Sequence, residues 1–154
     1  MGEGPDLPPV RLTAEAWESL FCAQVAVMKV LRQDEAFKQL GIRDYDVLFN
    51  LSRCATGWAR LNELNANLLI SQPSLSRMVE RLEAKGLIQR RPAKNDHRGV
   101  ELSLTEEGRA LQKRIGTSHV RVIQETLGPV LSVEELEQFR QLTTKISAGL
   151  ERPS

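Results

Sequence analysis

The sequence predicts a mainly α-helical protein with one small β-hairpin, and three observations support this fold class. Apolar residues recur at every third or fourth position along most of the chain, as in segment 75–82. The spacing changes to every second residue in segment 100–104, which is typical of a half-buried strand. Gly41, Gly86 and Gly128 each follow a helical segment and mark its end. The remainder of the chain is expected to be turns and a short N-terminal arm.

The length and composition indicate one small globular unit. The chain has 154 residues, of which 41% are hydrophobic and 27% charged, as in ordinary soluble proteins. This length fits one domain, or one domain with dimerisation arms. No apolar run approaches the roughly 18 residues of a membrane span, and the N-terminus has no apolar signal-peptide segment. We therefore expect a cytoplasmic protein that does not enter a membrane.

The charges are unevenly distributed. Residues 60–98 hold eight basic and four acidic side chains, whereas the rest of the chain holds 13 basic and 16 acidic ones. A basic centre between more acidic arms indicates that one module binds a polyanion.

The first forty residues are predicted to form a dimerisation helix. Segment 1–10 is rich in glycine and proline and reads as a flexible arm. Thr13 is a candidate N-cap for a helix that runs to about Leu40. Segment 20–31 is apolar on nearly every side of that helix, so we expect it to be buried all round. A chain this small can hardly cover it alone, so a partner subunit covers part of it or a ligand cavity borders it.

Two shorter helices are expected next. Asp44 is a candidate N-cap for a helix over 45–55, and a third helix is expected over 59–68. The residues expected to face inward are Val47, Leu48, Leu51, Leu61, Leu64 and Leu68. A tight turn at 69–70 then leads into the next helix.

Segment 71–91 has the features of a nucleic-acid-binding helix. Ser71 is a candidate N-cap, with its hydroxyl accepting a backbone N–H, and Pro73 lies in the first turn where no N–H is needed. Arg77 and Arg81 share a face with Pro73, whereas apolar residues occupy the opposite face. An apolar back and a guanidinium-rich front suit a DNA major groove, although an ordinary solvated surface helix is the alternative. Helix, short turn and basic-faced helix is the helix-turn-helix pattern.

A basic hairpin is predicted after this helix. Segment 88–91 is the expected first strand and segment 100–104 the second. The segment between them, 92–99, is expected to be a loop longer than the usual two to five residues, with Lys94 and Arg98 near its tip. A projecting basic hairpin after a helix-turn-helix is a wing.

The C-terminal third is predicted to be helical. Thr105 is a candidate N-cap for a helix that ends at Gly128, and Ser132 with Glu135 forms a capping box before a final helix. The small winged module offers these helices no core of their own, so we expect them to form a dimer bundle with the first helix. The predicted organisation is a single regulator domain over 1–154. It comprises an arm and dimerisation helix (1–40), a winged helix-turn-helix core (41–105) and dimerisation helices (106–154).

Residues 60–109 resemble the winged helix-turn-helix core of MarR-type transcriptional regulators. The most specific part is Asp96-x-Arg98, followed by Leu102-x-Leu104-Thr105-x-x-Gly108. The resemblance implies a homodimer with recognition helices in successive major grooves and wings along the minor groove. It also implies, as in many members, a small-molecule pocket between the DNA-binding and dimerisation lobes.

Carried over position by position, the resemblance implies a set of DNA-binding residues in the recognition helix and the wing. These are Gln72, Pro73, Ser74, Ser76, Arg77, Arg81, Lys94, Asp96, His97 and Arg98. Arg98 matches the wing arginine of the minor groove, and Asp96 the acid that braces it. For Lys94 and His97, a solvated loop is the alternative.

Ligand and redox sites are weaker expectations. The candidate ligand-binding residues are Trp17, Phe21, Met28, Arg43, Trp58 and His119. An apolar stripe at helical spacing is, however, more often protein core than ligand pocket. Cys22 lies near the position of the reactive cysteine in the thiol-sensing branch, but the accompanying tyrosines are missing. Cys22 and Cys54 form no zinc spacing and His119 stands alone, so neither a metal nor a cofactor is expected.

The sequence therefore predicts a DNA-binding transcriptional repressor. It would bind a pseudo-palindromic operator of double-stranded DNA as a homodimer, and a small, partly aromatic ligand would release it. One alternative is a thiol-based regulator that uses Cys22, and another is a winged-helix interaction module that does not bind DNA. An enzyme is not expected, because the sequence offers no nucleophile–base pair, phosphate-binding loop or metal cluster.

Overall fold

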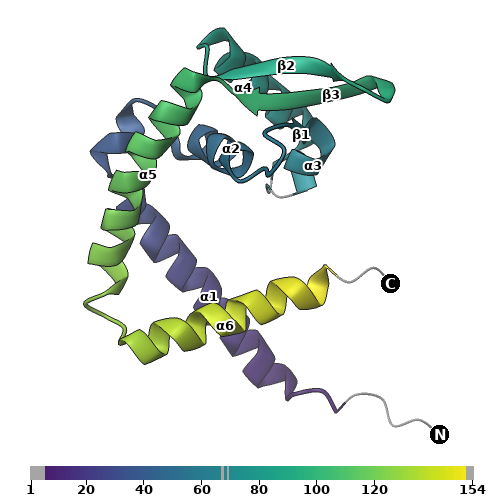
Figure 1. Cartoon of the computed structure of the whole chain (residues 1–154). Helices are drawn as coiled ribbons and strands as arrows, with labels where there is room; N and C mark the ends of the chain where they lie inside the picture. Colours follow the sequence, from purple (N-terminus) through teal and green to yellow (C-terminus); the bar gives the residue numbers. More distant parts are fainter. Residues whose placement is uncertain (1–5, 67, 69, 152–154) are drawn as a thin grey trace, which may run out of the picture. The chain divides into compact units, whose positions relative to one another are not determined.

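The computed structural model describes residues 6–66, 68 and 70–151, without the side chains of Ala66 and His97. The chain divides into two compact units. The central unit is Arg32–Val120, and the terminal unit combines Met1–Leu31 with Arg121–Ser154. In chain order the elements are α1 (Val10–Leu31), the 3₁₀ helix η1 (Glu35–Lys38), α2 (Ile42–Ser52), β1 (Ala59–Arg60), α3 (Leu61–Ala66), α4 (Gln72–Ala84), β2 (Ile88–Ala93), β3 (Asp96–Leu104), α5 (Glu106–Leu127) and α6 (Val133–Leu150) (Figure 1). The mainly helical fold with a small antiparallel sheet is confirmed.

One hydrophobic core holds the central unit together. Its buried members lie between Phe37 and Ile115 and come from η1, α2, α3, α4, the sheet and α5. The largest fully buried side chains are Leu40, Val47, Leu48, Leu75, Val79, Leu82, Ile88 and Leu102. The predicted inward faces of α2 and α4 are therefore correct. Each buried leucine contributes roughly 2 kcal/mol of hydrophobic free energy, so this core fixes where α4 and the hairpin lie.

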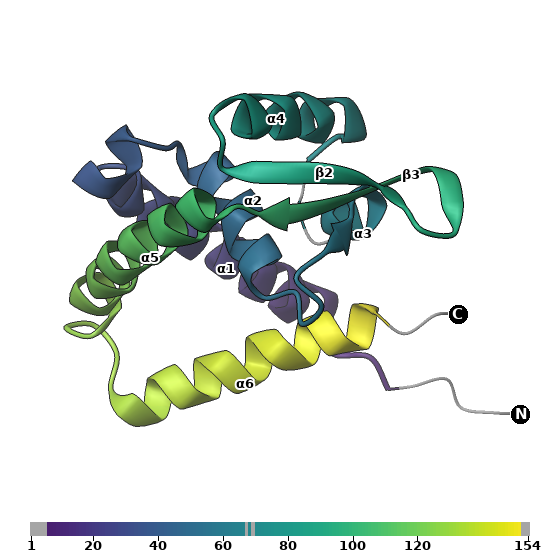
Figure 2. The ribbon, with the colours of Figure 1, turned by 45° about the horizontal axis from the view of Figure 1, so that its top comes forward.

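The hairpin is longer and its turn is tighter than predicted. The sheet has the strand order β1-β3-β2, and both pairings are antiparallel. Ala93 pairs with Asp96, so the turn is only Lys94 and Asn95, and the predicted loop over 92–99 is wrong. The neighbouring pair is Pro92 with Val100, so the residues between Asp96 and Val100 form an irregularity in β3. A bulge of this kind bends the strand, and Figure 2 shows the hairpin projecting beyond α3 and α4.

The first helix differs from the prediction at both ends. It begins at Val10 and ends at Leu31, and Thr13 is a helical residue whose hydroxyl donates to the Pro9 carbonyl at 3.1 Å. A separate 3₁₀ turn follows, because the Asp34 carboxylate accepts the Ala36 N–H at 3.0 Å. Local side-chain bonds of this kind compete with continued helix.

The starts of α2 and α3 also differ from the prediction. Gly41 is the N-cap of α2, and Asp44 lies inside its first turn. Ala59 and Arg60 pair with β3 instead of opening a helix, so α3 has only six residues. A two-residue strand is too short to show an alternating pattern, which explains the error. The predicted turn at 69–70 includes a residue outside the description.

A tight joint connects the end of α4 to the start of α5. Gly86 has a φ of 72°, a left-handed conformation typical of the residue after a helix, which confirms that it marks the end of α4. The Thr105 hydroxyl donates to the Gly86 carbonyl at 2.6 Å and accepts the Gly108 N–H at 3.0 Å. A Cβ on Gly108 would lie 1.9 Å from the Leu87 carbonyl oxygen. The predicted cap at Thr105 is confirmed, and Gly108 is required by the close approach of two backbones.

The terminal unit has almost no buried residues. The Ser132 hydroxyl accepts the Glu135 N–H at 3.2 Å, and the Glu135 carboxylate accepts the Ser132 N–H at 2.8 Å. This confirms the predicted capping box. None of the described residues of α6 is buried, and in α1 only Leu31 is. Within one chain, segment 20–31 is therefore largely uncovered, as expected for a helix that a single small chain cannot bury. Among the described residues, no helix is both long and apolar enough to cross a membrane.

Candidate nucleic-acid interface

Helix α4 has one buried and one exposed face. Leu75, Met78, Val79 and Leu82 are buried in the core of the central unit. The predicted contact residues on the other face are exposed, except Ser76, which is half-buried; they are Gln72, Pro73, Ser74, Arg77 and Arg81. The core thus orients α4 so that its polar side chains point away from the protein.

The N-terminus of α4 lacks the predicted capping hydrogen bond from the Ser71 side chain. Ser71 occupies the N-cap position, but its hydroxyl makes no capping bond to the backbone. It donates to the Ser74 hydroxyl at 2.9 Å instead. The predicted position of the cap is confirmed and its predicted hydrogen bond is wrong.

Arg81 is engaged within the protein. Its Nη2 lies 2.9 Å from Oδ1 of Asp44 on α2, and the two side chains are 55% and 14% exposed. This ion pair ties α4 to α2 across the helix-turn-helix. A guanidinium that already bonds a carboxylate must break or share that bond to reach DNA. Sequence reasoning missed Asp44 as its partner, because nothing in the spacing links residues 37 positions apart.

The wing residues lie at and beside the two-residue turn. Lys94 is in the turn and is exposed, and Asp96 and Arg98 are exposed residues of β3. The Asp96 carboxylate accepts the backbone N–H of Arg98 at 3.0 Å, which holds the strand irregularity at Arg98. The side chain of His97 is outside the description.

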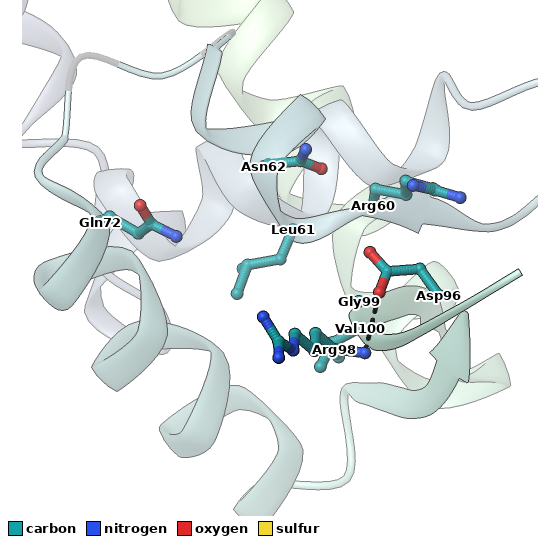
Figure 3. Close-up of a pocket in the computed structure, with 8 residues that line it drawn as sticks. All are labelled: Arg60, Leu61, Asn62, Gln72, Asp96, Arg98, Gly99 and Val100. Carbon is teal, nitrogen blue, oxygen red and sulfur yellow. Dashed lines mark hydrogen bonds between the residues drawn. The ribbon is translucent and has the colours of Figure 1, made fainter.

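A cleft separates the wing from the start of the helix-turn-helix. Its volume is about 210 Å³, and its lining consists of Arg60, Leu61, Asn62, Gln72, Asp96, Arg98, Gly99 and Val100. Figure 3 shows the Arg98 side chain extending from β3 below Leu61 and toward α4. The Arg60 guanidinium points the other way, to the outer side of the cleft. The structure thus brings predicted residues from the recognition helix and the wing together with Arg60 and Asn62, which sequence reasoning missed. The basic and amide side chains of these two residues were the features of the sequence that could have identified them as candidate DNA contacts.

The other arginines of the hairpin are bonded within the protein. Arg90 pairs with Glu83 of α4 at 2.6 Å, and Arg91 pairs with Glu101 of β3 at 2.7 Å. The Arg91 guanidinium also stacks over the Trp58 ring, 3.9 Å from its centroid. These contacts hold the wing against the rest of the central unit.

The candidate ligand residues belong to both units. In the terminal unit, Trp17 and Phe21 are 67% and 54% exposed, and Met28 is half-buried. Trp17 lines an apolar groove of about 580 Å³ together with residues of α1 and α6. Cys22 is an exposed free thiol.

In the central unit, the candidate ligand residues have different neighbours. Arg43 is exposed, and Trp58 immediately precedes β1. His119 packs edge-on against the rings of Phe37 and Tyr45, with centroids 5.2 and 5.5 Å away. Its Nδ1 is buried with no hydrogen-bond partner among the described residues. The structure thus places Trp58 against Arg91 and His119 in a separate aromatic cluster.

Burial shifts the titration of this aromatic cluster. It lowers the pKa of His119 below the usual 6.5, and the carboxylates of Asp46 and Asp34 partly offset that effect. Burial raises the pKa of Asp46, and His119 offsets part of that shift. Among the described residues, no group of three or more His, Cys, Asp or Glu side chains could hold a metal ion.

These features define a class of protein. Helix α4 buries its apolar face and exposes its polar face, and a basic β-hairpin lies next to it. This is the architecture of winged helix-turn-helix DNA-binding proteins. The arrangement can bind a polyanion and read base edges, and the cleft supplies guanidinium and amide donors rather than a reacting pair.

Comparisons with known proteins agree with this class. The model of the MarR family matches residues 38–99. The HTH-type transcriptional regulator PecS of Dickeya dadantii is 32% identical over 120 residues, which are 76% of this chain and 72% of PecS. The transcriptional repressor MprA of Escherichia coli is 31% identical over 91 residues, or 59% of this chain and 51% of MprA.

Solved structures share the fold. Sco3205, a MarR family transcriptional regulator of Streptomyces coelicolor in complex with DNA, has a TM-score of 0.76 at 23% identity, over 98% of this chain and 94% of Sco3205. Bordetella bronchiseptica BpsR, whose DNA binding is regulated by 6-hydroxynicotinic acid, has a TM-score of 0.75 at 25% identity, over 86% of this chain and 98% of BpsR. The chain belongs to the MarR family, and it is a DNA-binding transcriptional regulator.

Proposed function

We propose that this regulator is a cytoplasmic repressor that binds a pseudo-palindromic operator as a homodimer. The observation that carries the proposal is the exposed front of α4, where Gln72, Ser74 and Arg77 face away from the core. Gln72 lines the same cleft as Arg98 of the wing. Side chains of these types bond to base edges and phosphates. A dimer that covers a promoter would exclude the polymerase, which is the simplest form of repression.

The terminal unit supports the homodimer. Its apolar groove is lined by Leu12, Trp17 and Leu20 of α1 and by Phe139, Leu142 and Ile146 of α6. Groups of large exposed apolar side chains of this kind usually mark a protein–protein interface. Two recognition helices related by a two-fold axis would read half-sites about 10 base pairs apart.

The test begins with a pool of random-sequence duplexes. Repeated selection by the full chain should yield one pseudo-palindromic site that binds two chains per duplex. Placed over a promoter, that site should block transcription in a purified system when the protein is added. If the chain binds no duplex at any salt concentration, the DNA-binding role is refuted and an interaction module becomes the better interpretation.

We further propose that a small, partly aromatic ligand releases the operator. The proposed ligand-binding residues are Trp17, Phe21 and Met28 in the terminal unit, and Arg43, Trp58 and His119 in the central unit. The regulation of BpsR by an aromatic acid supports this class of ligand. Such a ligand must bind the DNA-free state more tightly than the DNA-bound state, because equal affinity would shift nothing. Titration with aromatic acids should therefore release the operator, and substitution of Trp17 by alanine should weaken that effect.

A thiol switch at Cys22 is the rival mechanism, and the exposure of this cysteine favours it. A reactive thiol, however, needs a nearby positive charge to favour the thiolate. The basic residues that follow it in α1 begin at Lys29, almost two turns away. The variant Cys22→Ser should therefore keep its response to the natural inducer. Release of the wild type by organic peroxide, but not of Cys22→Ser, would establish the thiol mechanism instead.

A further inference from the structure

The arginines around the wing fall into two groups. Arg81, Arg90 and Arg91 each bond a carboxylate within the central unit. Arg60 and Arg98 line the same cleft, and neither forms an ion pair with a carboxylate in the described part of the chain. A guanidinium without a carboxylate partner can bind a phosphate without first losing an internal bond.

The strand pairing explains why Arg60 has no carboxylate partner among the described residues. Arg60 of β1 lies opposite Glu101 of β3, and so does Arg91 of β2. The Glu101 carboxylate bonds Nε of Arg91 at 2.7 Å, and Arg91 is also held by the Trp58 ring. The acid that faces Arg60 across the sheet is therefore already occupied.

The backbone of Arg60 is nevertheless well positioned. Its strand pairing to β3 is continued by a hydrogen bond from the Arg60 N–H to the Glu63 carboxylate at 3.2 Å. Arg60 is half-buried, and Figure 3 shows its guanidinium on the outer side of the cleft, away from the Arg98 guanidinium. A rigid backbone and a free guanidinium together present a cation at a defined place beside the wing.

The lining of the cleft favours an anion. It contains two arginines and one acid, together with the amides of Asn62 and Gln72. The acid is Asp96, and one of its oxygens accepts the Arg98 N–H. The two arginines outnumber this one carboxylate, so the net charge of the lining is positive, and a polyanion passing along the wing would meet it.

We propose that Arg60 binds a phosphate of the DNA backbone beside the wing, and that this contact is separate from the one that Arg98 makes with the duplex. The proposal rests on the DNA-binding function of the central unit. Arg60 then fixes the position of the wing on the duplex and carries no base preference, because phosphates are the same at every step. Arg90 and Arg91 hold the hairpin in place through their carboxylate partners.

The test measures how the affinity for duplex DNA of random sequence depends on salt. Fluorescence anisotropy between about 50 and 200 mM salt gives the slope of log affinity against log salt concentration, which changes by about 0.9 for each phosphate contact. Arg60→Gln should reduce the slope by about 0.9 per bound protomer, and Arg60→Lys should restore it. Arg60→Ala is the second neutral variant if Arg60→Gln does not fold.

The matched control is Arg53→Gln. Arg53 is an exposed arginine of the same unit, it lies over the Phe49 ring, and it lines a different cleft. Its loss should leave the slope at the wild-type value, and thermal unfolding should show that every variant is folded. A wild-type slope for folded Arg60→Gln would overturn the proposal.

The double variant Arg60→Gln/Arg98→Gln tests whether the contacts are separate. If the reductions in the salt slope caused by the two single variants add in the double variant, Arg60 and Arg98 contact the duplex at two separate places. A double variant with no greater loss than either single variant would mean one shared phosphate and would overturn the arrangement proposed here. If the wild type itself bound no duplex, the function of the central unit would fail rather than the role of Arg60.

Discussion

The central and terminal units stabilise their helices in different ways. The central unit buries residues from Phe37 to Ile115 in one core. The terminal unit instead exposes large apolar side chains, among them Trp17 at 67% and Leu142 at 62%. The central unit has its own buried core, whereas the described helices of the terminal unit leave most of their large apolar side chains exposed.

This difference fits the proposed division of the chain into a DNA-binding unit and a dimerisation unit. The internal core fixes the positions of α4 and the hairpin, so the central unit can hold their exposed side chains in place for DNA. The exposed apolar faces of the terminal unit suit association with a second copy, which would set the spacing of two such DNA-binding surfaces. The predictions below probe the two units separately.

The largest expected effect is in the terminal unit. Leu142→Glu would place an ionised carboxylate in the apolar groove, where burial costs several kcal/mol. We expect the wild type to sediment at about twice 17.3 kDa and the variant to sediment as a monomer at micromolar concentration.

Gln138→Glu is the control, because it adds the same charge to α6 at an exposed position outside the groove. It should remain dimeric. A monomeric wild type would contradict the proposed dimer, and a dimeric Leu142→Glu would contradict the assignment of the groove to its interface.

The second effect is in the central unit. Gly108→Ala would place a Cβ 1.9 Å from the Leu87 carbonyl, so α5 must move away from the end of α4. We expect a loss of about 3 kcal/mol in the free energy of unfolding, measured by urea denaturation. Gly149→Ala in α6 meets no atom within 4 Å and should instead be neutral or stabilising by about 0.5 kcal/mol. Equal stability of the two variants would show that the joint is not rigid.

A third prediction separates two arginines of α4. Arg77→Ala should weaken binding to the selected operator by roughly 1–3 kcal/mol and reduce base preference, with unfolding unchanged, since Arg77 is exposed. Arg81→Ala loses its ion pair with Asp44 and should lower stability by about 1 kcal/mol, while base preference is kept. Competition assays on single-base operator variants measure that preference. If Arg81→Ala instead reduced the base preference, Arg81 would have to be one of the residues that contact bases.

The smallest expected effect is the pH dependence of the central unit. Burial lowers the pKa of His119 in the folded chain below its usual 6.5, so the unfolded chain binds the proton more tightly. Its contribution to stability is therefore complete above pH 6.5 and is lost as the pH falls toward the folded pKa. Between pH 7.5 and pH 5.5, the free energy of unfolding measured by denaturation should fall further for the wild type than for His119→Gln. An identical loss in both would mean that His119 does not titrate in this range.

Local patterns were enough to predict much of the DNA-binding module. The apolar period of α4, the proline in its first turn, Gly86 and the Thr105 cap are decided by neighbours within a few residues, and the structure confirms each. The capping box at Ser132 is equally local. The predictions were wrong where the structure depends on residues far away in the sequence. At β1, for example, two residues form a strand only because β3 lies beside them.

By itself, the sequence determined the order of the helices, the position of the hairpin and the side chains on the front of α4, because helical and strand periods depend on local spacing. Only the tertiary structure decided which of the basic side chains are free. Arg81, Arg90 and Arg91 bond carboxylates on other elements, whereas Arg60 faces an acid that is already taken. Charge counts along a chain cannot make this distinction, since an ion pair depends on distances that only packing establishes.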